Sequence, residues 1–157
     1  MPNGTHDEGP SLVVLVRHAD IEGAPGADPP LSEMGMLRAK ELLRIVGTIE
    51  AVGGEVLSLH ASDARRTQAT LQPLAEALHL PITISDPTKT AALTASVLGA
   101  HGGVAIVAGH SNTIPPLIHS LRGPGDIVIR ETEFNRLFLL TGAGSGAAVM
   151  VELKYGR

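Results

Sequence analysis

Two short, unbroken apolar runs most constrain how this chain can fold. Leu12–Val16 and Val104–Ala108 contain no polar residue and are rich in branched side chains. This pattern is typical of strands buried on both faces of a parallel sheet. Between the two runs the spacing becomes helical, with Leu71, Leu74 and Leu78 three and four residues apart. Alternating strands and helices predict an α/β fold, in which a mostly parallel central sheet carries helices on both faces.

The same patterns predict the order of the elements. Ser32 is predicted to cap a helix that has Glu33 in its first turn and ends near Val46. Residues 1–11 are expected to form a disordered tail, and residues 12–157 one domain. The further expected strands are 56–59, 81–84, 137–140 and 149–153, and the further expected helices are 64–78, 90–100 and one after residue 109.

The composition excludes several classes of function. The chain has no cysteine, which rules out disulfides, thiolate catalysis and cysteine-ligated zinc. A formal net charge of −4 gives no general attraction to nucleic acid or to an anionic membrane, so neither partner is expected. Residues 1–10 lack the basic start and apolar stretch of a signal peptide. We therefore expect a cytoplasmic protein, although an exported chain whose leader had been removed would look the same. The oligomeric state is not predicted.

Side chains that carry chemistry follow three of the predicted strands. Arg17 and His18 follow the first strand, Arg66 lies in the helix after the second, and His110 follows the run that ends at Ala108. Each has an ordinary structural explanation when taken singly, as a solvated strand end, a helix-face cation or a buried histidine. In open α/β sheets, however, ligands bind outside the carboxyl ends of the strands. The convergence of all four residues on one edge therefore favours a binding or catalytic site.

Phosphoryl transfer is the chemistry that needs this set of residues. A guanidinium fork binds two phosphoryl oxygens at once, so Arg17, Arg66 and a donor from His110 could hold the transferred group. His18 is then left as the nucleophile, and the nearby arginines favour its neutral form. Its second ring nitrogen needs an acceptor such as a backbone carbonyl. No histidines have metal-ligand spacing, so neither a metal nor a cofactor is expected.

These segments resemble the motifs of the histidine phosphatase, or phosphoglycerate mutase-like, superfamily. The stretch from Val16 to Asp20 is similar to the family's Arg-His-Gly signature, with Ala19 at the glycine position. The other matching motifs, in the family's order, are Pro30-Leu31-Ser32 followed by Gly35, Ser62 to Thr70 with its central Arg66, Gly109 to Thr113, and Tyr155-Gly156. The resemblance implies a small, single-domain, bacterial-type member with a three-layer fold and covalent chemistry on His18.

The chain departs from the family pattern where a proton donor would lie. Mutases carry a catalytic glutamate in an insertion after the third strand, but Asp86–Leu98 holds no glutamate and has no room for a cap. A mutase is therefore not expected. Asp20 is the preferred acid, because short bacterial members often carry an acidic residue there; it could equally be a charged loop residue. The remaining candidates, none with a positional match, are Glu22, Asp86, Glu131 and Glu133.

The sequence thus predicts a metal-independent phosphatase that hydrolyses phosphate monoesters through a phosphohistidine intermediate. Its partner would be a phosphorylated small molecule or a phosphoprotein. One alternative is a protein phosphohistidine phosphatase of a signalling phosphorelay, because that substrate needs little help from a general acid. An alternative from another class is a non-catalytic module that binds a phosphorylated ligand.

Overall fold

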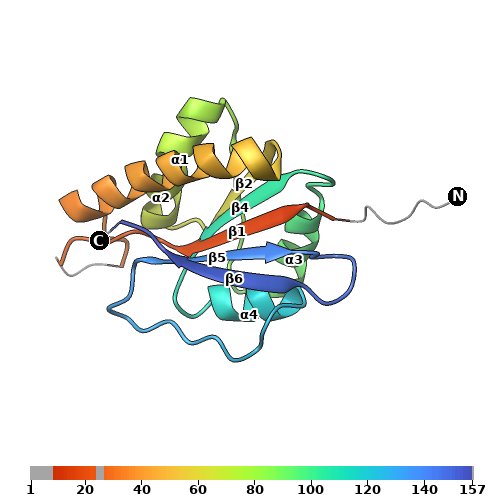
Figure 1. Ribbon diagram of the computed structural model, residues 1–157. Coiled ribbons are helices and arrows are strands. Elements are labelled where there is room, and N and C mark those ends of the chain that lie inside the picture. Colours follow the sequence, from red (N-terminus) through yellow and green to blue (C-terminus); the bar gives the residue numbers. More distant parts are fainter. Residues whose placement is uncertain (1–8, 24–26, 157) are drawn as a thin grey trace, which may run out of the picture.

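The two apolar runs form the centre of a single sheet in the computed structural model, which describes residues 9–23 and 27–156. The strand order is β3-β2-β4-β1-β5-β6, with β1 and β4 side by side (Figure 1). β1 to β4 pair in parallel, whereas β5 and β6 are antiparallel additions at one edge. The predicted mostly parallel sheet is therefore confirmed. The strands are β1 (Leu12–Arg17), β2 (Val56–Ala61), β3 (Ile82–Ile84), β4 (Val104–Gly109), β5 (Arg136–Thr141) and β6 (Val149–Lys154).

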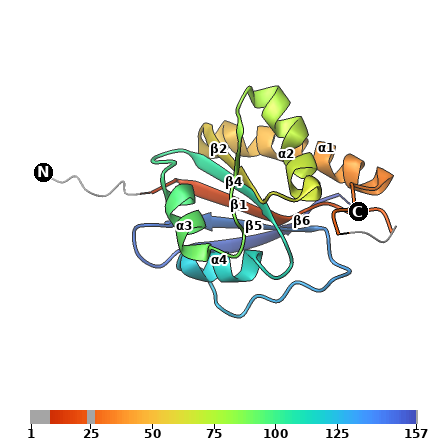
Figure 2. The same ribbon diagram turned by 180° about the vertical axis from the view of Figure 1, so that it is seen from behind.

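Helices cover both faces of the sheet because the central strands are apolar on both sides. Val14 and Val16 of β1 pack in one core with Leu42 of α1 (Glu33–Gly53) and with α2 (Arg65–Leu78). Val13 and Leu15 point the other way, into a core shared with α3 (Thr90–Leu98) and α4 (Ile114–Ser120). Figure 1 shows α1 above the sheet and α4 below it, and Figure 2 shows α3 and α4 from behind. The three-layer fold class is confirmed.

Some boundaries differ from those expected. α1 continues past Val46 to Gly53 because the buried Ile49 keeps its apolar face packed on the sheet. Its C-cap is Gly54, whose φ of 104° suits glycine. α3 ends at Leu98 instead of residue 100. Residues 1–8 of the tail predicted for residues 1–11 lie outside the described residues. At the other end of that stretch, the Ser11 backbone N–H donates a hydrogen bond to the Gly103 carbonyl at 2.8 Å.

The start of α1 packs tightly on the segment that follows β1. Ser32 caps the helix as predicted, since its Oγ accepts a hydrogen bond from the Gly35 backbone N–H at 3.1 Å. A Cβ atom on Gly35 would overlap the backbone carbonyl of Asp20. Glycine at this position therefore allows α1 to support the turn that carries His18. Among the helices described, none is both long and apolar enough to cross a bilayer.

Candidate active site

The carboxyl end of β1 presents His18 in a fixed orientation. Its backbone N–H donates to the Gly109 carbonyl at 2.8 Å, which continues the pairing of β1 with β4 by one residue. The ring is 4% exposed, and its Nδ1 lies 2.9 Å from the Ala19 carbonyl. A carbonyl can only accept, so Nδ1 carries the proton and Nε2 keeps a free lone pair. The backbone acceptor expected from the sequence is therefore present.

The surroundings of His18 keep its ring uncharged. Burial, together with the nearby charges of Arg17 and Arg66, lowers the pKa of His18 to about 4. The hydrogen bond to the Ala19 carbonyl acts in the opposite direction but is outweighed. At neutral pH the imidazole is consequently a neutral base with Nε2 available for nucleophilic attack.

Arg17 is clamped by the loop between α4 and β5. Its Nη1 donates to the carbonyls of Arg130, Glu131 and Glu133 at 3.2, 2.8 and 3.0 Å, and its guanidinium lies 4.0 Å from the centre of the Phe134 ring. Its Nε is buried and has no hydrogen-bond partner among the described residues. Nη2 has one long contact, 3.4 Å to the Glu131 carboxylate. The Nε–Nη2 edge is thus left as a fork suited to a bidentate anion.

α2 supplies Arg66 and also holds the His18 turn. The Ala19 backbone N–H donates to Thr70 Oγ1 at 2.8 Å, and this hydroxyl donates to the Arg66 carbonyl at 2.7 Å. The Arg66 side chain is mostly buried and its guanidinium lies 3.6 Å from the carboxylate of Asp28. The Ser62–Thr70 motif therefore places a second cation and fixes the nucleophile's backbone through one helix.

His110 faces His18 from the end of β4. The two ring centroids are 5.4 Å apart at an interplanar angle of 66°. His110 Nε2 lies 2.9 Å from Ser62 Oγ, and that hydroxyl lies 2.8 Å from Thr67 Oγ1. Burial lowers the pKa of His110, as do Arg66 and Arg17. Because Nε2 is bonded to Ser62, Nδ1 is the ring nitrogen left to contact a ligand.

The structure thus brings together the four predicted residues His18, Arg17, Arg66 and His110, but gives Asp20 a different partner. The Asp20 carboxylate accepts a hydrogen bond from Arg38 Nε at 2.6 Å. Arg38 in turn donates from Nη1 to the Tyr155 carbonyl at 2.6 Å. Asp20 therefore ties the His18 turn to α1 and to the end of β6. Its predicted role as proton donor stays a prediction.

Among the other acid candidates, Glu131 contacts Arg17 through its side chain. One of its carboxylate oxygens contacts Arg17, and the other accepts a hydrogen bond from Ser111 Oγ at 2.7 Å. Glu133 instead bonds the Arg130 backbone and Arg136, and Asp86 bonds Thr88 within its own turn.

Sequence reasoning missed three supporting contacts: those of Ser62, Glu131 and Phe134. Ser62 begins the predicted Ser62–Thr70 motif, but its contact with His110 was not predicted. A signal for Ser62 was available, because β2 and β4 run parallel and both end at this edge. Glu131 and Phe134 lie in an irregular loop with no periodicity, which offered no comparable signal.

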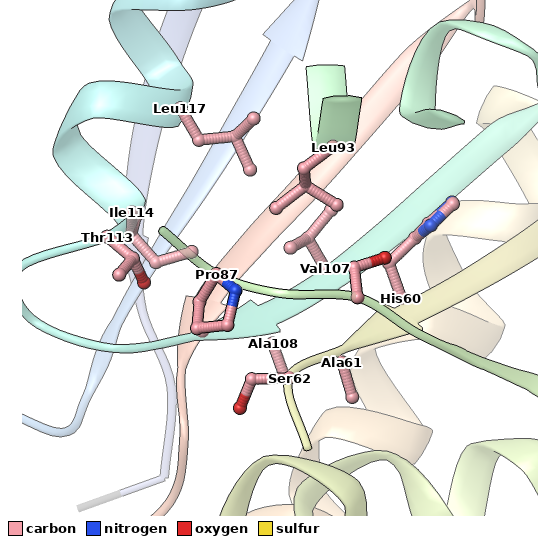
Figure 3. A pocket seen from close by; sticks show the side chains of 12 residues that line it. His60, Ala61, Ser62, Pro87, Leu93, Val107, Ala108, Thr113, Ile114 and Leu117 are labelled. Carbon is pink, nitrogen blue, oxygen red and sulfur yellow. The ribbon is translucent and has the colours of Figure 1, made fainter. Parts of the chain in front are cut away.

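A small cavity lies beneath the site, between the sheet and helices α3 and α4. Figure 3 shows Ser62 and Ala108 at one end, with Leu93 and Leu117 at the other. Its volume of about 10 Å³ has room for about one water molecule. A phosphate cannot fit in that volume, so this cavity is not the candidate anion site. Within the described ranges, no group of three or more histidine or acidic side chains is placed to hold a metal ion.

Comparison with protein families finds a known superfamily similar to part of the chain. Residues 13–88 match the model of the histidine phosphatase superfamily (branch 1), a segment that includes His18, Arg17 and Arg66. The resemblance predicted from the motifs is confirmed over this segment. A search of curated proteins by sequence finds no match.

Solved structures share the fold across nearly the whole chain. The protein histidine phosphatase SixA complexed with tungstate is 19% identical, with a TM-score of 0.68 over 91% of this chain and 96% of that one. The mycobacterial glucosyl-3-phosphoglycerate phosphatase complexed with inorganic phosphate is 15% identical, with a TM-score of 0.67 over 94% of this chain and 97% of that one. At these identities the similarity establishes the fold.

Proposed function

We propose that the chain is a phosphatase that hydrolyses phosphate monoesters through a covalent phosphohistidine intermediate on His18. The observation that carries this proposal is the hydrogen bond from His18 Nδ1 to the Ala19 carbonyl, which leaves an unprotonated Nε2. The Nε–Nη2 edge of Arg17, whose Nε has no partner among the described residues and whose Nη2 has only a long contact with Glu131, supports an anion site together with Arg66 and His110. The match of residues 13–88 to the histidine phosphatase superfamily model agrees with this chemistry.

In the first step, Nε2 of His18 attacks phosphorus in line with the leaving oxygen. The N–P bond forms while the P–O bond to the leaving group breaks. Arg17, Arg66 and His110 hold the three equatorial oxygens and stabilise their charge. The leaving oxygen takes a proton from a general acid or from water. We propose Asp20 as that acid, and the leaving-group experiment in the Discussion tests it.

In the second step, water attacks the phosphohistidine. A new P–O bond forms, the N–P bond breaks, and the electron pair returns to Nε2 as inorganic phosphate leaves. The proton lost by the attacking water returns to the acid, or to the solvent, that protonated the leaving oxygen in the first step. The same three groups hold the oxygens again, so both half-reactions use one pocket. All the charge stabilisation comes from protein side chains, so turnover is expected to survive chelators. Loss of turnover with EDTA, restored by Mg²⁺ or Zn²⁺, would contradict this assignment.

A phosphohistidine protein of a signalling phosphorelay is the second candidate substrate. The solved structure of protein histidine phosphatase SixA, which shares the fold, favours it. Only the turn of residues 85–89 lies between β3 and α3, so no capping insertion restricts access from that side. This short connection also speaks against a mutase. Both candidate substrates share the same nucleophile and the same arginines.

Steady-state hydrolysis of an aryl phosphate tests the proposed function. We expect turnover by the wild type and loss of about 10³-fold or more in His18→Ala, because the nucleophile is removed. His60→Ala is the matched control, since His60 is also buried but lies on β2, with its Nε2 bonded to Ser58. If phosphate binds to the wild type without turnover, the chain is a non-catalytic binding module instead.

A further inference from the structure

Carboxylates surround both arginines of the candidate site. Glu131, whose side chain is 82% exposed, contacts Nη2 of Arg17 at 3.4 Å. Asp28, 47% exposed, lies 3.6 Å from Nη1 of Arg66. These acids come from two separate loops, one before α1 and one before β5. Each guanidinium that would bind phosphate is therefore paired with a carboxylate at the surface.

Hydrogen bonds hold the two carboxylates in place. Glu131 is held at both oxygens, since Ser111 Oγ donates to Oε2 at 2.7 Å while Oε1 contacts Arg17. Asp28 accepts a hydrogen bond from the Arg65 backbone N–H at 2.9 Å, at the start of α2. The positions of these negative charges are thus set by the same segments that form the site.

A third carboxylate lies near His110. The exposed side chain of Asp63 is close enough to His110 to oppose the fall in its pKa. Three carboxylates therefore lie around the two arginines and His110.

The direction of the reaction decides which part of a substrate meets these acids. His18 is buried at the base of the site and attacks from there. In-line displacement places the leaving group opposite the nucleophile, which is toward the surface. With the phosphoryl oxygens held by the arginines, the exposed Glu131 and Asp28 lie on the outer side of the site, where the leaving group would be.

We infer that this site selects phosphorylated substrates whose leaving group is neutral or cationic, and that Glu131 is its main specificity-determining residue. This inference rests on the proposed function. A leaving group that carries its own carboxylate meets like charge at Glu131 and Asp28, and like charges in contact disfavour binding. A leaving group with an ammonium or imidazolium group meets opposite charge. Glycerate-type phosphates are therefore poor substrates, and phosphorylated amines or amino alcohols are better ones.

The test uses three aryl phosphates whose leaving groups have matched pKa values and carry a trimethylammonium, a neutral or a carboxylate substituent. Matching removes the chemical difference, so the ratio of kcat/KM values reports charge alone. We expect the wild type to prefer the cationic over the anionic substrate by about tenfold or more at low salt, because the charges lie within a few ångströms. Added salt should reduce the ratio, because exposed charges are screened.

Glu131→Gln identifies the residue responsible. We expect this variant to reduce the cation-to-anion ratio by about threefold or more, and Asp28→Asn to reduce it less. Any gain from freeing Arg17 is common to all three substrates and cancels in the ratio. Glu55→Gln makes the same charge change just before β2, at the opposite end of the strands, and should leave the ratio unchanged. Equal rates for the charged substrates in the wild type, or an unchanged ratio in Glu131→Gln, would overturn the inference.

Binding of the matching phosphonates, measured by calorimetry, separates this inference from the proposed function. If none of the three esters is hydrolysed, the proposed function fails. The phosphonates still report the charge preference, because binding needs no turnover. Tighter binding of the cationic phosphonate, weakened in Glu131→Gln, supports the inference; no preference overturns it.

Discussion

The role of each buried histidine follows from its neighbours rather than from its pKa. Burial lowers the pKa of both His18 and His60 to about 4. His60 bonds Ser58 through Nε2, and its Nδ1 is buried without a partner among the described residues. His18 lies instead beside His110 and is affected by the charges of two arginines. The two histidines therefore have similarly lowered pKa values, although His60 is a structural residue and His18 is the candidate nucleophile.

Conservative substitution of either arginine tests the anion site. Arg17→Lys and Arg66→Lys keep the charge but remove the planar fork, so both should lower kcat/KM by about 10²-fold for every phosphorylated substrate. Arg17→Lys should have the larger effect, because Arg17 also holds three carbonyls of the following loop. Arg65→Lys serves as the control, because Arg65 is exposed and directly precedes Arg66 in the sequence. A loss confined to one class of leaving group would contradict a common phosphoryl site.

Asp20→Asn tests the proton-donor assignment. If Asp20 protonates the leaving oxygen, the slope of log(kcat/KM) against leaving-group pKa should become steeper in the variant, because alkyl leaving groups need the proton most. An unchanged slope with a uniform loss would give Asp20 only the structural role seen in its contact with Arg38. Arg38→Gln is the matched control, since it breaks the same contact and leaves the carboxylate.

At the scale of elements, the approach of α1 to the His18 turn depends on one glycine. Gly35→Ala should destabilise the fold by about 1–3 kcal/mol, because its Cβ would overlap the Asp20 carbonyl. It should also lower kcat by displacing the turn. Gly47→Ala, in the same helix with open space around it, should stabilise the protein by about 0.5–1 kcal/mol. Chemical denaturation measures the change in stability of both variants. Equal changes in Gly35→Ala and Gly47→Ala would refute the close-packing explanation.

The elements that could be predicted from the sequence are those with strong periodicity. The apolar runs around Val14 and Ile106 are buried on both faces, so their patterns located the central strands and the edge where the site lies. The end of α1 was missed because Gly47 and Thr48 look like a stop, whereas burial of Ile49 continues the helix. The loop over Arg17 is irregular and had no pattern from which its contacts could be inferred.

At the scale of the whole molecule, the buried histidines make stability depend on pH. The pKa of His18 and of His60 falls from 6.5 to about 4 on folding, so the unfolded chain binds more protons between these values. Stability is therefore full above about pH 6.5 and falls as the pH drops toward 4. The free energy of unfolding should be measured between pH 6.5 and 4.5. In His60→Leu its fall over this range should be smaller by about 2 kcal/mol than in the wild type. His101→Gln, at an exposed position, should not alter it.

The account as a whole depends on a phosphoryl group being bonded to His18, and rapid quenching during turnover tests this most directly. Labelled substrate should leave label on the wild-type protein in a phosphoramidate linkage, which is labile in acid and stable in base. Mass spectrometry should place it on His18, and His18→Ala should retain none. An acid-stable phosphoserine, a hydroxylamine-sensitive acyl phosphate, or label that persists in His18→Ala would contradict the account.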